Sequence, residues 1–244
     1  MKIHAQHATM DWADLIDPSI RLAEEGFILT SQGASSLNDA YGSFEDNNDT
    51  AITVLSKDEW KEGDLIKFPD LAETLKLIAL NGREGFYSGP VADKIVAEMS
   101  SSNGLITHED LKRYSSVWRD AIETSYKGHK VITMPLPSSG GVSLVQLLKG
   151  AEQIDMTSLP HNSASHIHYM TELQRRAYAD RAEWLGDPDF VDVDVERLTS
   201  LDYIKKRNSD IDAESKTDSQ DIKPGAVATI ESFETTHFSI VDQW

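Results

Sequence analysis

The feature that most constrains the fold is a strand-like alternation near the end of the sequence, at residues 236–241. Phe238 and Ile240 would face the same side of this strand, because side chains alternate along a strand with a period of two. A lone strand has no independent stability and needs partner strands in a sheet. We therefore expect the 244 residues to be an internal part of a longer protein, which supplies those partners.

Most of the remaining sequence carries helical patterns, with apolar side chains recurring every three or four residues. Leu71, Leu75 and Ile78 form one such stripe, and Asn81-Gly82 is a typical helix end. Thr107 resembles the first residue of a capping box at the start of a short helix. The predicted helices cover residues 17–26, 69–81, 88–99, 107–114, 142–148, 163–185 and 201–207.

Near the N-terminus the helical signal is weaker. The first ten residues show no periodicity, and residues 31–50 are rich in Ser, Asn, Asp and Gly, which is typical of a surface loop. Asp17-Pro18 is predicted to open the first helix, because Asp is a common N-cap and Pro suits the first turn.

One β pattern precedes the terminal strand. Residues 122–126 and 129–134 flank Lys127-Gly128, which predicts a hairpin around a tight turn. A chain of many helices with one hairpin and one further strand, without a regular alternation of strands and helices, indicates an α+β fold.

The charge of the chain argues against a nucleic-acid partner. The chain has 23 Lys and Arg residues against 41 Asp and Glu residues, which gives a net charge of −18, whereas binding to phosphate backbones needs a basic surface. No apolar run reaches the roughly 18 residues of a membrane span, and residues 1–15 contain no signal-peptide hydrophobic region. Since the chain has no cysteine, thiolate nucleophiles and Cys-ligated metals are excluded.

The segment from Glu234 to Asp242 holds the strongest candidate for catalysis, Thr235. A threonine hydroxyl is a weak nucleophile unless a base lies beside it, and a threonine that becomes the first residue of a chain has its own α-amine as that base. The spacing alone does not distinguish this role from that of a Thr-rich strand entry next to a surface histidine.

The sequence Thr235-Thr236-His237-Phe238-Ser239-Ile240-Val241-Asp242 closely resembles the segment that opens the small subunit of γ-glutamyltransferases. Upstream segments resemble motifs of the same family's large subunit in the same order. These are Gly85-Phe86-Tyr87 with Gly89, Gly104-Leu105-Ile106-Thr107 with Asp110-Leu111, Pro137-Ser138-Ser139-Gly140-Gly141, Tyr178-Ala179-Asp180-Arg181, and Leu185-Gly186-Asp187-Pro188-Asp189-Phe190.

The resemblance implies a partial αββα N-terminal-nucleophile (Ntn) hydrolase fold. Residues 1–234 would be a helix-rich portion of the large subunit, and residues 235–244 the truncated start of the small subunit. The precursor would cleave itself between Glu234 and Thr235, and Thr235 would then act as the nucleophile on glutathione and other γ-glutamyl amides. The γ-glutamyl group would pass through a threonine ester to water, an amino acid or a peptide.

The resemblance further implies that the protein needs no metal or organic cofactor and that its partner is its own small subunit. It also implies a periplasmic or extracellular parent protein, although this chain shows no export signal. The family's substrate-binding arginine and most of its small subunit fall outside the matched part, so Thr235 is the one site residue assigned. We expect the chain alone neither to cleave itself nor to hydrolyse a γ-glutamyl amide. The alternatives are a non-catalytic truncated fragment, or a relative acting on another acyl donor such as a cephalosporin side chain or poly-γ-glutamate.

Three further segments allow two interpretations each. The loop at residues 137–141 suits an anion-binding nest or, as we favour, a tight strand-to-helix connection. Asp180 and Arg181 are interpreted as a buried ion pair in preference to a catalytic acid and base. The acidic tract at residues 187–234 is interpreted as a solvated approach to the cleavage point, or as a segment whose mobility lets Thr235 reach the preceding carbonyl.

Overall fold

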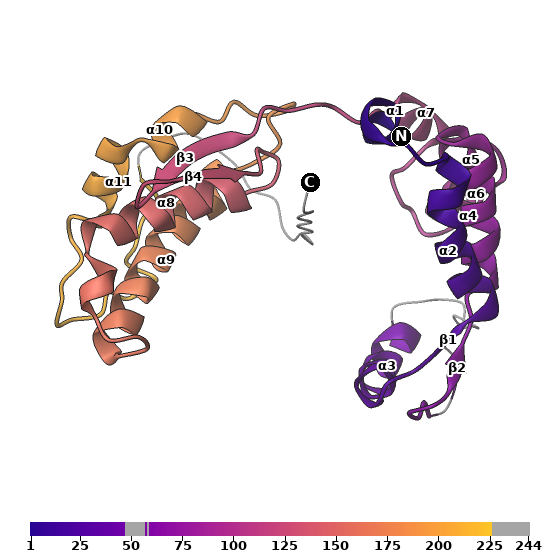
Figure 1. Cartoon of the computed structure of the whole chain (residues 1–244), viewed down its shortest axis with the longest axis horizontal. Coiled ribbons are helices and arrows are strands. Elements are labelled where there is room, and N and C mark those ends of the chain that lie inside the picture. The colour runs from indigo at the N-terminus through magenta and orange to yellow at the C-terminus, as the bar shows by residue number, and fades with distance from the viewer. Residues whose placement is uncertain (47–56, 58, 226–244) are drawn as a thin grey trace. The chain divides into compact units, whose positions relative to one another are not determined.

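The computed structural model describes residues 1–46, 57 and 59–225, and the chain divides into two units, Met1–Val117 and Trp118–Trp244 (Figure 1). Both units consist mainly of helices. The strands of the described residues form two antiparallel pairs, so the α+β class expected from the sequence is confirmed. Thr235 and the predicted strand at residues 236–241 lie outside the described residues. No helix in the described part of the chain is long and apolar enough to cross a membrane.

In the first unit, α2 (Trp12–Glu25) lies against α4 (Pro69–Asn81) (Figure 1). Ala23 and Ala72 are buried in these helices, and the Phe68 N–H donates to the Ala23 carbonyl at 2.8 Å where α4 begins. The other elements of the unit are α1 (Lys2–His7), β1 (Phe27–Ile28), α3 (Ser31–Asp46), β2 (Leu65–Ile66), α5 (Glu84–Tyr87), α6 (Gly89–Ser101) and α7 (His108–Arg113).

The start of α2 differs from the prediction. The helix begins at Trp12, and Pro18 lies inside it, so the prediction that Asp17-Pro18 opens the helix is wrong. A tertiary hydrogen bond holds the first turn, because the Trp12 Nε1–H donates to the Ile78 carbonyl of α4 at 2.9 Å. Gly26 ends the helix as expected, with a φ of 89°. The first ten residues, where no helix was expected, contain α1.

The prediction of a loop at residues 31–50 is also wrong over its first part, because Ser31–Asp46 form α3. This helix has few apolar residues, but Ala34 is buried against Leu29 and Trp60. The Asn38 side chain forms hydrogen bonds with both backbone groups of Trp60. It accepts one from the Trp60 N–H at 2.8 Å and donates one to the Trp60 carbonyl at 2.9 Å. Besides the packing of Ala34, a polar side chain therefore helps to hold α3, and a search for apolar periodicity does not detect such a contact.

Other helices match the predictions closely. α4 ends at Asn81 with Gly82 as its C-cap, and α6 begins after Ser88. The capping box of α7 is present: Thr107 Oγ1 accepts from the Asp110 N–H at 3.2 Å, and Asp110 Oδ2 accepts from the Thr107 N–H at 2.9 Å.

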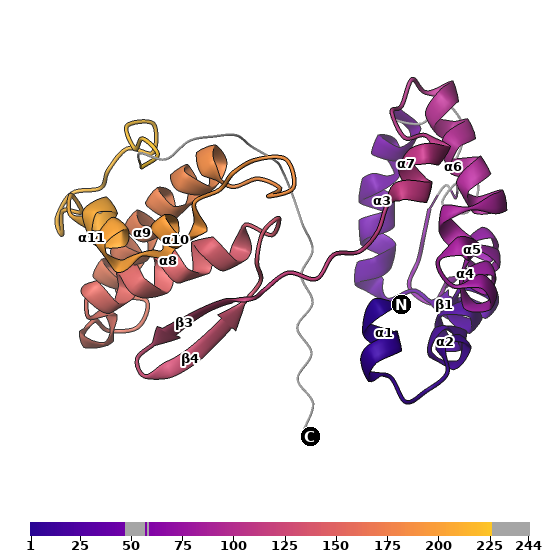
Figure 2. The same cartoon turned by 90° about the horizontal axis from the view of Figure 1, so that it is seen from above.

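The second unit is arranged around α8 (Gly140–Gln153). This helix contacts β3 (Ile122–Tyr126), β4 (His129–Thr133), α9 (Ala164–Trp184), α10 (Val195–Thr199) and α11 (Leu201–Asn208) (Figure 2). A 3₁₀ turn at Met156–Ser158 lies between α8 and α9. Val142 of α8 is in the same buried cluster as Trp184, Leu198 and Ile204. Because neighbours surround α8 on several sides, even polar positions such as Gln146 are buried on it.

The predicted hairpin is confirmed. β3 and β4 pair antiparallel, with Ile122 opposite Thr133 and Tyr126 opposite His129. Lys127 and Gly128 both have positive φ, 48° and 83°, as the favoured two-residue hairpin turns require.

The acidic tract is more ordered than expected as far as it is described. Residues 187–225 include α10 and α11, whose Leu198, Tyr203 and Ile204 are buried. The prediction of a solvated, flexible approach is therefore wrong for this part, because apolar side chains between the acidic residues dock it onto α8. Residues 226–234 lie outside the described residues.

Candidate functional site

The described chain ends at Gly225, ten residues before the predicted nucleophile Thr235 (235 − 225 = 10). The structure therefore describes how the chain is held upstream of the predicted cleavage bond. Two buried carboxylates on α9, Asp180 and Glu172, form the centres of this arrangement.

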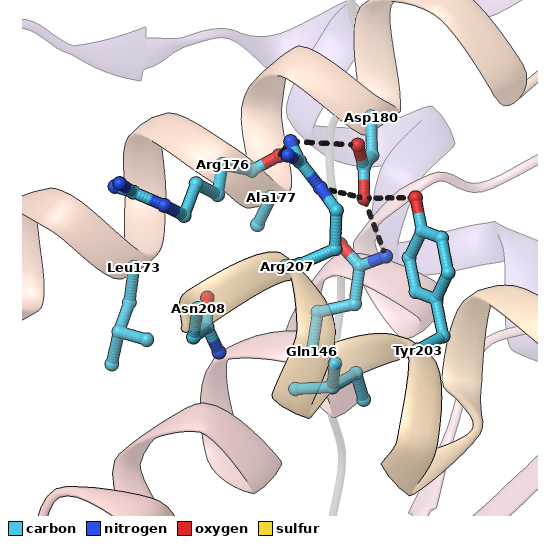
Figure 3. Close-up of a pocket in the computed structure, with 9 residues that line it drawn as sticks. Gln146, Leu173, Arg176, Ala177, Asp180, Tyr203, Arg207 and Asn208 are labelled. Atoms are coloured by element: carbon cyan, nitrogen blue, oxygen red, sulfur yellow. Dashed lines mark hydrogen bonds and ion pairs between the residues drawn. The ribbon is translucent and has the colours of Figure 1, made fainter. Parts of the chain in front are cut away.

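Asp180 lies in the last turns of α9, within the Tyr178–Arg181 motif, and is 2% exposed. Its Oδ2 accepts hydrogen bonds from the Tyr203 hydroxyl at 2.7 Å and from Gln146 Nε2 at 3.2 Å (Figure 3). Arg207 forms an ion pair with it, with 2.9 Å between Nη2 and Oδ1 and 3.2 Å between Nε and Oδ2. Side chains from α8 and α11 thus converge on one carboxylate, and the Arg207 guanidinium compensates its buried charge.

The last described residue also binds Asp180. The Gly225 N–H donates to Asp180 Oδ1 at 2.8 Å. A Cβ at Gly225 would lie 2.0 Å from the Tyr203 oxygen and 2.8 Å from Arg207 Cδ, so no larger residue fits without a shift. Asp180, Tyr203, Arg207 and Gly225, which we call the Asp180 anchor, therefore fix the chain at Gly225.

The protonation state of Tyr203 suits this arrangement. Burial first, and then the hydrogen bond and charge of Asp180, raise the pKa of the Tyr203 phenol well above its ordinary value. The phenol therefore keeps its proton and remains a donor to the carboxylate throughout the physiological pH range.

The predicted ion pair between Asp180 and Arg181 is wrong. Adjacent residues on a helix do not face each other, and Arg181 instead donates from Nε to Ser139 Oγ at 2.9 Å. The partners of Asp180 are Gln146, Tyr203 and Arg207, none of which the sequence interpretation singled out. They lie 23–34 residues from Asp180 along the chain, and no local pattern identifies them.

Glu172, two turns earlier on α9, holds a second point of the tract. It is 1% exposed; Arg176 Nη1 donates to Oε2 at 2.7 Å, and Oε1 accepts from Arg175 Nη1 at 2.6 Å and from the Thr217 N–H at 3.0 Å. Burial by itself raises the pKa of Glu172, but the hydrogen bonds from Arg176 and Thr217 outweigh it and lower the pKa to about 2. Glu172 is therefore ionised at neutral pH and fixes Thr217 to α9.

The loop at residues 137–141 acts as a tight connection. A Cβ on Gly141 would lie 1.9 Å from the carbonyl oxygen of Met134, the residue that follows β4. The backbone there is too close to Gly141 for any side chain. The Ser139 hydroxyl is bonded to Arg181. These contacts support the connection that we favoured over an anion-binding nest.

The Leu185–Phe190 motif forms a loop braced by Arg119. Arg119 Nη2 lies 2.6 Å from Asp189 Oδ2 and 3.6 Å from Asp187 Oδ1. Asp187 also accepts from the Asp189 N–H at 3.0 Å, which tightens the turn, while Phe190 remains 86% exposed.

Taken together, the fold is the helix-rich part of an Ntn-hydrolase type structure. The family model described as "Gamma-glutamyltranspeptidase" matches residues 1–244, so the chain belongs to the gamma-glutamyltranspeptidase family.

Individual relatives agree with this assignment. The glutathione hydrolase proenzyme of Escherichia coli (strain K12) is 40% identical over 98% of this chain and 41% of its own length. The crystal structure of Helicobacter pylori gamma-glutamyltranspeptidase superposes with a TM-score of 0.85 at 38% identity, covering 92% of this chain and 65% of that chain. The chain thus spans about two fifths of the length of the curated relatives it matches.

Relatives with other names also match. The acylase ACY 1 proenzyme of Pseudomonas sp. (strain SE83) is 33% identical over 98% of this chain and 42% of its own length. The capsule biosynthesis protein CapD proenzyme of Bacillus anthracis is 32% identical over 99% of this chain and 42% of its own length. The family therefore includes proteins named for different reactions, which bears on the choice of acyl donor.

Proposed function

We propose that the whole protein transfers or hydrolyses γ-glutamyl groups, with glutathione and related γ-glutamyl amides as donors. Thr235 Oγ first attacks the Glu234 carbonyl carbon, and the acyl group moves from nitrogen to oxygen. Water then hydrolyses the ester, which leaves a carboxylate on Glu234 and a free α-amine on Thr235. That amine assists Thr235 Oγ as it attacks the γ-carbonyl of the substrate.

As the γ-glutamyl-threonine ester forms, the amine of the donor leaves with the proton taken from the threonine hydroxyl. The ester then passes its acyl group to water, an amino acid or a peptide. The tetrahedral intermediates need oxyanion donors, which the resemblance assigns to the small subunit. That subunit is therefore the required partner, and no metal or organic cofactor enters these steps. By the same resemblance, we expect the parent protein to be periplasmic or extracellular.

The observation that carries the proposal is the family match over residues 1–244, which includes the Thr235-Thr236-His237 segment. The 40% identity to a protein named glutathione hydrolase proenzyme supports glutathione as a donor.

The test uses the full-length gene product in three forms: wild type, Thr235→Ala and Thr235→Ser. N-terminal sequencing of the small chain should find Thr235 as its first residue in the wild type. Thr235→Ala should stay uncleaved and inactive on a γ-glutamyl anilide, because it lacks the hydroxyl. Thr235→Ser keeps a hydroxyl and should still be cut at the same bond. A different new terminus, or cleavage of Thr235→Ala, would refute the assignment.

A second candidate donor follows from the relatives named acylase ACY 1 and CapD, at 33% and 32% identity. The same threonine would then take its acyl group from a cephalosporin side chain or from poly-γ-glutamate. Comparing kcat/KM of the mature wild type for a γ-glutamyl anilide, a cephalosporin amide and poly-γ-glutamate decides between them. The γ-glutamyl anilide should have the highest value. An uncleaved and inactive wild type would favour the non-catalytic alternative.

A further inference from the structure

Two histidine side chains come together where α9 begins. The imidazole rings of His161 and His166 have their centres 5.7 Å apart, and the ring planes make an angle of 58°. His161 is exposed and His166 is partly exposed. Within the described residues neither imidazole forms a hydrogen bond, whereas the rings of His4 and His168 each bond a backbone carbonyl. The ring nitrogens of this pair are therefore available to a ligand.

One residue, Ser163, fixes the backbone of both histidines. Its N–H donates to the Pro160 carbonyl at 3.0 Å, which closes a turn with His161 and Asn162 at its centre. Asn162 has a φ of 57°, and a positive φ at this position is typical of a type II turn. The Ser163 hydroxyl accepts from the His166 N–H at 3.2 Å and caps α9. Both side chains thus project from a braced backbone, so that less freedom is lost when they bind one ligand together.

The separation of the rings suits coordination of a single metal ion by both. An imidazole nitrogen binds Zn²⁺ at about 2.0–2.1 Å, which places the ion about 3.2 Å from the ring centre. Two rings on one ion then have their centres about 4.5 Å apart when the bonds are at right angles, and about 6.4 Å apart when they are opposite. The observed 5.7 Å lies within this range.

We propose that His161 and His166 together bind a divalent cation of the late first-row transition metals, such as Ni²⁺, Cu²⁺ or Zn²⁺. Imidazole nitrogen is a preferred ligand of these ions, whereas Mg²⁺ and Ca²⁺ prefer oxygen. Among the described residues no group of three or more His, Asp or Glu side chains could hold a metal ion. The pair therefore supplies two ligands, and water completes the coordination. This inference does not depend on the proposed function.

Two electrostatic effects act on a cation at this place, with opposite sign. The net charge of −18 attracts cations to the chain. The positive end of α9 repels them, because its first turn contains His166 but no acidic residue. Binding therefore depends on the two imidazoles acting together. Linking two ligands raises the affinity about 100-fold or more over one ligand alone, so the loss of either ring should weaken binding about 100-fold.

The test variants leave the start of α9 intact. His166→Gln removes one ligand but places Gln three residues after Ser163, which matches the capping-box pattern and keeps the helix start stable. His161→Gln removes the other ligand at an exposed position. His168→Gln is the matched control, because the His168 ring donates to the Asp212 carbonyl at 2.8 Å and lies two residues from His166, on a different face of the helix.

The experiment titrates the full-length protein with NiCl₂ by isothermal calorimetry and measures hydrogen exchange with and without Ni²⁺. Wild type and His168→Gln should bind a Ni²⁺ ion that His161→Gln and His166→Gln bind about 100-fold more weakly. Ni²⁺ should also slow exchange in the first turns of α9 in wild type and in His168→Gln, because a ligand of the folded form stabilises that form. Without Ni²⁺ the variants should exchange no faster than wild type, so that a lost affinity reports a lost ligand.

Three results would overturn the proposed metal site. The first is wild-type Ni²⁺ affinity in either His161→Gln or His166→Gln. The second is an equal loss of affinity in His168→Gln, and the third is the absence of Ni²⁺-dependent protection in the first turns of α9. Each of them would leave the proposed function intact, because neither histidine of the pair takes part in it.

Discussion

Replacing Arg176 by Met tests how the second unit holds its buried charge. Arg176 is 2% exposed, and its guanidinium donates to Glu172 Oε2 at 2.7 Å and contacts Asp210 Oδ1 at 2.9 Å. Methionine is of similar length and is a good helix former, so α9 keeps its local propensity. The substitution leaves the Glu172 carboxylate buried without its most deeply buried cationic partner.

The magnitude can be worked from Glu172. A carboxyl whose pKa falls from 4.5 to about 2 on folding is favoured in its charged form by about 3 kcal/mol. Breaking a buried ion pair by removing one partner costs about 3–5 kcal/mol, which agrees with this value. We therefore expect Arg176→Met to lower the free energy of unfolding of the second unit by about 3 kcal/mol at pH 7.

The pH dependence has a definite sign. Because the folded pKa of Glu172 is depressed, the wild type has this stabilisation in full above pH 4.5 and loses it as the pH falls toward 2. At pH 4 the wild type has lost about 1 kcal/mol of it. In Arg176→Met, Glu172 without Arg176 is expected to take up a proton more readily. Lowering the pH therefore neutralises its buried charge and reduces the destabilisation of the variant. The difference between the two proteins should therefore shrink by about 1 kcal/mol between pH 7 and pH 4.

Hydrogen exchange of peptides from α9, read by mass spectrometry, measures the opening free energy of this unit separately from the first. Comparing the two proteins at the same pH cancels the intrinsic exchange rates. At pH 7 the α9 amides of Arg176→Met should exchange more than a hundredfold faster. The control is Arg175→Met, which removes the more exposed partner of the same carboxylate, 24% exposed, and should cost about 1 kcal/mol or less. A difference of under 1 kcal/mol for Arg176→Met, or one that does not change with pH, would refute the reasoning.

Two further substitutions test local features. Gly141→Ala should destabilise the chain by about 1–3 kcal/mol in thermal unfolding, because its Cβ would lie 1.9 Å from the Met134 carbonyl oxygen. The control is the adjacent Gly140→Ala, whose Cβ would have its nearest neighbour 3.7 Å away and which should be neutral or slightly stabilising. Equal effects of the two substitutions would contradict the argument. Thr107→Ala should cost about 1 kcal/mol by removing the capping box of α7, and Thr107→Ser should restore it; unchanged exchange rates in α7 for Thr107→Ala would count against the cap.

Features that depend on neighbouring residues could be predicted from the sequence. The Thr107 cap, the hairpin turn at Lys127-Gly128 and the start of α9 at Ser163 all occur as expected. Each depends on groups only a few residues apart, so residue type and spacing are sufficient. α3 was missed because it has few apolar residues, and local spacing does not reveal the hydrogen bonds between Asn38 and the Trp60 backbone, 22 residues further along the chain.

By itself, the sequence determined the family, through motifs that occur in a fixed order, and it singled out Thr235 as the candidate nucleophile. Only the tertiary structure decided what Asp180 does. Its partners Tyr203, Arg207 and Gly225 lie 23, 27 and 45 residues away, whereas the sequence interpretation assigned the adjacent Arg181. The physical reason is that helical periodicity reports which face a residue occupies, but not which distant side chains pack against that face. A buried carboxylate must be paired, and the fold of α8, α9 and α11 determines which groups pair with it.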